Sequence, residues 1–292
     1  MPWLQLIFET SLEEAQPLAD LLSEHEAAAV TLQDGADQPL YEPPPGATPL
    51  WQSTHVIGLY PAELDSEALI AALAAAWAPK PLPQWRLSPL EDKDWSRAWM
   101  DDFHPLRFGE RLWIVPSWHE PPQAQGVNIL LDPGLAFGTG THATTRLCLE
   151  WLDAHPPQEA EVIDYGCGSG ILALGAAKLG ATWVRCVDND PQALLATAEN
   201  ARRNGCEARL TTYLPGDLPP EPVDLLLANI LAGPLVELAP RLTALVRPGG
   251  HIVLSGILAE QASMVSDAYR EAFEMGPIAE HEGWVRLEGR RK

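Results

Sequence analysis

A chain of 292 residues can hold two domains, and a formal net charge of -21 argues against direct binding of nucleic acid. The excess of 40 Asp and Glu over 19 Lys and Arg favours a basic partner, unless the acidity serves only solubility. Cysteines at 148, 167, 186 and 206 lack disulfide or metal-ligand spacing, and no apolar run spans a bilayer, so we expect a cytoplasmic protein with reduced thiols, no metal and no membrane segment.

Residues 1–90 form the first predicted domain, a ferredoxin-like α+β sandwich. The hydrophobic pattern gives the order βαββαβ, with strands at 3–9, 28–33, 55–60 and 85–87 and helices at 12–23 and 66–77. This part has no cluster of catalytic side chains and no basic, aromatic surface of the kind that binds RNA. We expect a recognition or packing module, and the favoured partner is a protein.

Residues 91–104 predict a linker helix. Trp95 and Trp99 are one turn apart on one face, and His104-Pro105 ends the helix. The helix is either a semi-rigid spacer between two globular units or is docked permanently through both tryptophans.

Residues 105–292 form the second predicted domain, in which strands alternate with helices as in a doubly wound, mostly parallel sheet. Strands are expected to end at Asp164 and Asp188 and to cover 208–213, 223–228, 251–255 and 284–287. One helix is expected to begin near residue 144, and another to follow the glycine turn and end at Gly180. A third is expected from Pro191 to Gly205 with Asp190 as its cap, and two more over 234–246 and 259–273.

The segment 164–170, Asp-Tyr-Gly-Cys-Gly-Ser-Gly, predicts a strand-turn-helix that binds a nucleotide. The dinucleotide pattern needs a glycine where Ile171 stands, and a pyrophosphate would lie close to Asp164. A carboxylate suits the sulfonium and ammonium groups of S-adenosylmethionine, while Asp188 can accept hydrogen bonds from its ribose. The alternative is a turn that only permits tight packing, and Cys167 fits there as a small side chain better than as a nucleophile.

A second loop, 132–142, contains three glycines around Phe137 and ends at His142. Such a loop can cover a ligand, with Phe137 as an aromatic wall and His142 as a proton acceptor. Alternatively it is an ordinary surface loop, and His142 only donates or accepts hydrogen bonds or faces solvent.

Asn229 follows an apolar strand, where its side-chain carbonyl can accept a hydrogen bond from an amine N–H and aim the lone pair at an activated methyl group. Amino-group methyltransferases commonly have Asn-Pro-Pro-aromatic here, whereas this chain has Asn-Ile-Leu-Ala. The alternative is that Asn229 caps the helix that follows. The chemistry predicted is direct displacement by a neutral amine, without a nucleophilic side chain.

Three segments together, 131–142, 164–170 and 228–235, resemble the PrmA family of bacterial methyltransferases that act on ribosomal protein L11. The opening Met1-Pro2-Trp3 and the segments 91–95 and 103–105 match as well, so the resemblance extends over essentially the whole chain. It implies a Rossmann-like class I methyltransferase sheet behind a ferredoxin-like substrate domain.

The resemblance also implies methylation of lysine ε-amines and the N-terminal α-amine of that protein, with S-adenosylmethionine as cofactor. We expect the enzyme to be a monomer. Residues implied to contact the cofactor are Thr145, Asp164, Gly166, Gly168, Asp188 and Asn229. Those implied to lie near the incoming amine are Phe137, His142 and Trp284. Two alternatives stay open: a methyltransferase of a small amine or nucleic-acid base, and a non-enzymatic binding module on the same fold.

Overall fold

The structure, a computed structural model of the chain, describes residues 3–36, 38, 49–90, 103–123, 125–132 and 140–292. The chain divides into two compact units, Met1–Met100 and Asp101–Lys292. Separate hydrophobic cores lie in the two units, so each has its own packing. The predicted linker helix falls almost entirely outside the described residues.

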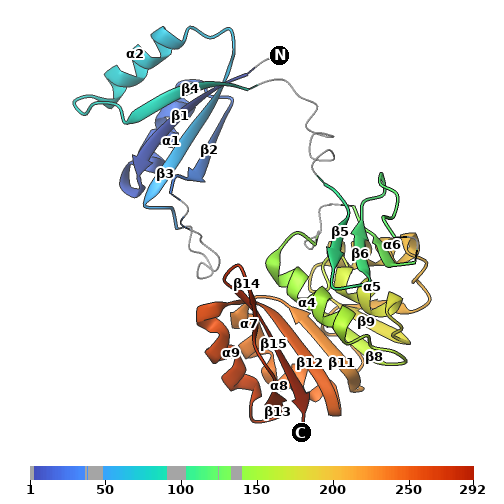
Figure 1. Ribbon diagram of the computed structural model, residues 1–292. Helices are drawn as coiled ribbons and strands as arrows, with labels where there is room; N and C mark the ends of the chain where they lie inside the picture. The colour runs from blue at the N-terminus through green and yellow to red at the C-terminus, as the bar shows by residue number, and fades with distance from the viewer. Residues whose placement is uncertain (1–2, 37, 39–48, 91–102, 124, 133–139) are drawn as a thin grey trace. The chain divides into compact units, whose positions relative to one another are not determined.

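The first unit is a four-stranded antiparallel sheet with two helices (Figure 1, blue to cyan). Its elements are β1 (Trp3–Ser11), α1 (Leu12–Glu24), β2 (Ala29–Asp34), β3 (Ser53–Pro61), α2 (Ser66–Trp77) and β4 (Gln84–Leu90). The strand order β2-β3-β1-β4 is that of the ferredoxin-like sandwich, which confirms the predicted fold. Leu18 and Leu22 of α1 pack with Leu73 of α2 in one core, which places both helices on the same face.

A small three-stranded sheet opens the described part of the second unit. It contains β5 (Leu106–Phe108), β6 (Leu112–Val115) and β7 (Val127–Leu130), of which β5 and β6 are antiparallel and β6 and β7 parallel. Asp153 is 4% exposed and accepts hydrogen bonds from Glu110 N at 2.7 Å and Arg111 N at 3.3 Å. Since Asp153 belongs to α4 (Ala143–Ala154), it anchors the β5–β6 turn to that helix.

The main sheet has eight strands, and seven of them follow the order β10-β9-β8-β11-β12-β15-β13. The strands are β8 (Glu161–Tyr165), β9 (Trp183–Val187), β10 (Leu210–Tyr213), β11 (Val223–Asn229), β12 (Val246–Leu258), β13 (Phe273–Met275), β14 (Ala279–His281) and β15 (Trp284–Arg291). The first five in the order are parallel, while β15 is antiparallel to β12, β13 and β14. The order turns back on itself between β8 and β11, where doubly wound sheets bind ligands.

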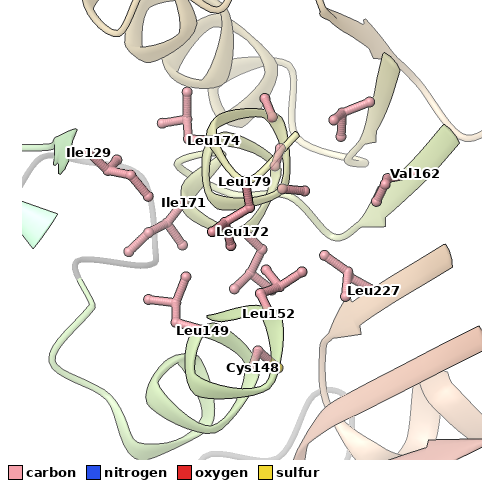
Figure 2. Close-up of a cluster of buried hydrophobic side chains, with 14 of the residues drawn as sticks. Ile129, Cys148, Leu149, Leu152, Val162, Ile171, Leu172, Leu174, Leu179 and Leu227 are labelled. Carbon is pink, nitrogen blue, oxygen red and sulfur yellow. The ribbon is translucent and has the colours of Figure 1, made fainter. Parts of the chain in front are cut away.

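Helices cover both faces of this sheet (Figure 1). One core joins the strands to α4, α5 (Ile171–Lys178) and α6 (Pro191–Arg203), and Figure 2 shows leucines of α4 and α5 facing Val162 and Leu227. The opposite core joins them to α7 (Ala232–Glu237), α8 (Ala239–Ala244) and α9 (Ala262–Tyr269). Successive residues of β11 therefore alternate between two buried faces, with Leu227 in one core and Leu226 in the other.

Two helix predictions are wrong in extent. The helix expected over 234–246 is two short helices that meet at Leu238, because Pro240 has no N–H to donate to the preceding turn, and Val246 already belongs to β12. The helix expected over 259–273 is a 3₁₀ turn (Ala259–Gln261) followed by α9, and Phe273 begins β13. That strand pairs with β15, a long-range contact that overrides the local helical pattern.

Candidate functional site

The glycine turn lies at the carboxyl end of β8, between β8 and α5. Gly166 N and Cys167 N both donate to Val187 O of the neighbouring strand β9, at 2.7 and 3.0 Å. Gly166 has a φ of +80°, and the side chain of Ile230 fills the space where a Cβ would stand. Both the backbone conformation and the close approach of Ile230 therefore require glycine.

Asp164 is buried beneath this turn. It is 1% exposed, and its Oδ2 accepts a hydrogen bond from Ala173 N at 3.0 Å, while Oδ1 has no partner within the described ranges. Burial raises the pKa of Asp164 to about 7, and the negative charge of Asp188 adds to this, whereas the bond from Ala173 lowers it. A buried carboxylate oxygen without a partner is a place where a cation or a hydrogen-bond donor would be stabilised.

Asp188 directly follows β9 and is held by two backbone groups. Its Oδ2 accepts from Gly168 N at 2.9 Å and its Oδ1 from Asp190 N at 3.0 Å. Asp190 in turn caps α6, accepting from Gln192 N at 2.8 Å, so the predicted Asp-Pro helix start is confirmed. Because each carboxylate oxygen can accept more than one hydrogen bond, Asp188 is oriented and retains acceptor capacity.

Asn229 is the last residue of β11, beside Ser255 of β12. Its Nδ2 lies 3.4 Å from Oγ1 of Thr145, a residue that is 1% exposed in the first turn of α4. The residue that caps α7 is Leu231, so the alternative role of Asn229 as that helix cap is wrong. The carboxyl ends of β8, β9 and β11 thus bring Asp164, Asp188 and Asn229 to one edge of the sheet.

His142 caps α4, and Trp284 lies against it. The His142 Nδ1 accepts from Thr144 N at 3.3 Å and lies 2.8 Å from Thr144 Oγ1, while the two ring centroids of His142 and Trp284 are 4.9 Å apart in an edge-to-face arrangement. Burial lowers the pKa of His142, against the smaller opposing effect of Glu282. His142 and Thr145 share the first turn of α4, which links this aromatic pair to Asn229. Phe137 lies outside the described residues.

Two residues that support the glycine turn were not predicted from the sequence. Thr197 Oγ1 donates to Gly168 O at 3.0 Å, and Asn200 Nδ2 donates to Ser169 O at 2.9 Å. Both lie on α6, three residues apart on one face, and Thr197 is fully buried. In the sequence, two polar residues at that spacing on an otherwise apolar helix face could have indicated this role.

A further acid, Asp217, stands just beyond the end of β10, in a turn closed by the bond from Asp217 N to Leu214 O at 3.0 Å. Asp188 N donates to Tyr213 O, so β10 ends beside Asp188. Sequence analysis did not select Asp217, although an acid after a strand was the signal used for Asp188.

The four cysteine thiols are free and buried, as expected. Thr197 Oγ1 lies 3.4 Å from the Cys167 sulfur. Among the described residues there is no group of three His, Cys, Asp or Glu side chains suited to a metal ion, and no helix is long and apolar enough to cross a membrane.

Three features together define a class I methyltransferase. They are the strand order with β15 inserted antiparallel near one edge, the glycine turn after β8 and the acid after β9. The family model for "Ribosomal protein L11 methyltransferase (PrmA)" matches residues 2–292, and the chain belongs to this family. The resemblance inferred from the motifs is confirmed.

Relatives of this chain carry the same description. A "Ribosomal protein L11 methyltransferase" of Marinobacter nauticus is 58% identical over 296 residues, which cover 100% of this chain and 99% of that protein. One of Pseudomonas paraeruginosa is 55% identical over 293 residues, with the same coverage. The crystal structure of a ribosomal protein L11 methylase from Lactobacillus delbrueckii subsp. bulgaricus is 34% identical, with a TM-score of 0.60, and covers 65% of this chain and 100% of its own.

Proposed function

We propose that this methyltransferase transfers methyl groups from S-adenosylmethionine to lysine ε-amines and the N-terminal α-amine of ribosomal protein L11. The observation that carries the proposal is the match to proteins of that description at 53–58% identity over 99–100% of the chain. A cytoplasmic, monomeric enzyme without direct contact to nucleic acid is part of the same proposal.

The buried carboxylate of Asp164 supports S-adenosylmethionine as the methyl donor. Its Oδ1 lacks a partner in the described part of the chain, and an anionic group there suits a cationic ligand. Asp188, which Gly168 N holds in place, would accept hydrogen bonds from the ribose. Gly166 would lie beside it in the same turn, and Thr145 and Asn229 would adjoin the cofactor. When bound, the cofactor supplies an activated methyl group on a positively charged sulfur.

The acceptor amine would bind beside Asn229. Since Nδ2 is directed at Thr145, the carbonyl oxygen of the amide is the atom able to accept an N–H of the amine and orient its lone pair. Trp284, His142 and, from the sequence, Phe137 would form an aromatic wall that excludes water. The amine must lose its proton before it attacks, and no side chain of the described region is assigned that role.

The hydrogen bond from Thr144 N to His142 Nδ1 argues against His142 as the base. A neutral imidazole that accepts at Nδ1 carries its proton on Nε2, so it has no second lone pair with which to take a proton. We propose instead that His142 caps α4 and supports Trp284.

Residues 1–90 are proposed as the substrate-recognition domain, 91–104 as a linker helix and 105–292 as the catalytic domain. The first 90 residues contain 12 Asp and Glu against 2 Lys and Arg, which suits a basic protein substrate.

The test is methylation of purified ribosomal protein L11 by the full chain with S-adenosylmethionine, followed by mass spectrometry of the product. Methylation at lysines and the N-terminus, with none on a second basic ribosomal protein, is expected. Transfer only to a small amine or a nucleic-acid base would favour the first alternative, and absence of cofactor binding by calorimetry would favour the binding module. A variant lacking residues 1–90 should keep cofactor binding and lose methylation of the protein.

A further inference from the structure

Ile230 is enclosed by two glycines from different parts of the site. Its Cγ2 atom occupies the position that a Cβ on Gly166 would need, with Ile230 Cβ at 3.7 Å. A Cβ on Gly256 would instead meet the Ile230 backbone, with the carbonyl carbon at 2.7 Å and the nitrogen at 3.1 Å as well as the carbonyl oxygen. The glycine turn and β12 therefore both press against one residue.

Gly256 occupies an unusual place in β12. The register with β15 shifts between Leu254 and Ile257, and Gly256 has a φ of +85° within that irregularity. The preceding residue, Ser255, is the partner of Asn229. Gly256 thus lets β12 approach the backbone immediately after Asn229.

We propose that Gly256 and Gly166 clamp Ile230 and so act as positioning residues for the Asn229 amide. The contact with Gly256 is made by backbone atoms, which cannot turn aside as a flexible side chain can, so an added methyl group must displace residue 230 and its neighbour Asn229. The contact with Gly166 ties the same residue to the turn assigned to the cofactor. This inference rests on the proposed function only where turnover is the measured quantity.

Gly256→Ala tests the clamp, and Gly249→Ala is the matched control. Gly249 is on the same strand with a φ of +79°, and the nearest atom to its Cβ would be Arg290 Nη2 at 3.8 Å, so it experiences the backbone strain without the clash. For Gly256→Ala we expect kcat to fall at least tenfold and the dissociation constant of S-adenosylmethionine to change less than threefold. Equal kcat values for the two variants would overturn the clamp.

The side-chain amide resonances of Asn229 give a readout that does not depend on activity. They are assigned by their loss in Asn229→Ala and should shift in Gly256→Ala but stay in place in Gly249→Ala. If the wild-type protein methylates no L11, the proposed function fails, while these resonances still decide the inference. Unmoved resonances in folded Gly256→Ala would contradict it.

Two further variants keep the inference testable if Gly256→Ala does not fold. Ile230→Ala removes the methyl group over Gly166 and should shift the Asn229 amide and lower kcat about threefold to fivefold, whereas Ile230→Val keeps Cγ2 and should stay within twofold of wild type. Equal kcat values and equal Asn229 amide shifts in these two variants would overturn the clamp.

If Gly256→Ala folds, it can also be combined with Asn229→Ala. In that background Gly256→Ala should cause little further loss of kcat, and an additive loss would show that Gly256 acts elsewhere.

Discussion

The Asn229 Nδ2 atom lies 3.4 Å from Thr145 Oγ1, and this hydrogen bond joins the end of β11 to the first turn of α4. The strand end is also fixed by pairing with Ser255 of β12. The backbone of Asn229 is thus fixed by β12 and its side-chain amide by Thr145, so the amide has a defined orientation before any ligand arrives, which is the condition for aligning an amine for in-line attack.

Replacement of Asn229 by alanine should therefore lower kcat more than tenfold, a barrier increase of at least about 1.4 kcal/mol, with a modest change in cofactor affinity. The measurement is single-turnover methylation alongside calorimetry with S-adenosylmethionine.

Thr145 provides the matched comparison for that experiment. Thr145→Val removes the hydroxyl that accepts from Asn229, so it should lower kcat by a smaller factor, while Thr145→Ser keeps the hydroxyl and should retain most of the activity. If Thr145→Val and Thr145→Ser gave the same kcat, the hydrogen bond would have no part in positioning.

Asp164 should make cofactor binding depend on pH. Burial raises its pKa from 3.8 to about 7. At a pH between these two values the folded protein keeps a proton on Asp164, whereas the unfolded chain has released it. The contribution of Asp164 to stability consequently falls as the pH rises through that window. A cationic cofactor interacts best with the ionised form, so its affinity should rise about tenfold between pH 6 and pH 8.

Calorimetry at pH 6, 7 and 8 checks the effect of Asp164, with Asp164→Asn as the control. The variant should bind S-adenosylmethionine more weakly and without this pH dependence. A wild-type affinity that stays constant from pH 6 to pH 8 would exclude ionisation of Asp164 as a factor in binding.

Asp188→Ala should weaken S-adenosylmethionine binding at least tenfold, because it removes the oriented acceptor for the ribose hydroxyls. Asp190→Ala is the control, since that neighbouring acid caps α6 and its loss should cost about 1 kcal/mol of stability with little effect on affinity. Unchanged binding in Asp188→Ala would remove the main support for a nucleoside site at this position.

Local chemistry explains what the sequence predicted well. The cap at Asp190, the glycine turn and the helix at 66–77 depend on near neighbours, and the structure contains all three. The helix expected over 259–273 failed because β13 forms by pairing with β15, which a local hydrophobic pattern does not reveal. The enclosure of Ile230 likewise depends on a register shift in β12, more than twenty residues further along the chain.

The capping role of His142 separates it experimentally from a catalytic base. Asparagine is a good helix cap that does not titrate near neutral pH, so His142→Asn should keep the start of α4 and most of the turnover. His142→Ala should lower the stability by about 1 kcal/mol, and it should lower kcat more than His142→Asn does, because the contact with Trp284 is loosened. The pH profile of kcat should have the same shape in wild type and His142→Asn. Equal, large losses in both variants, together with loss of a titration near the lowered pKa of His142, would restore it as the proton acceptor.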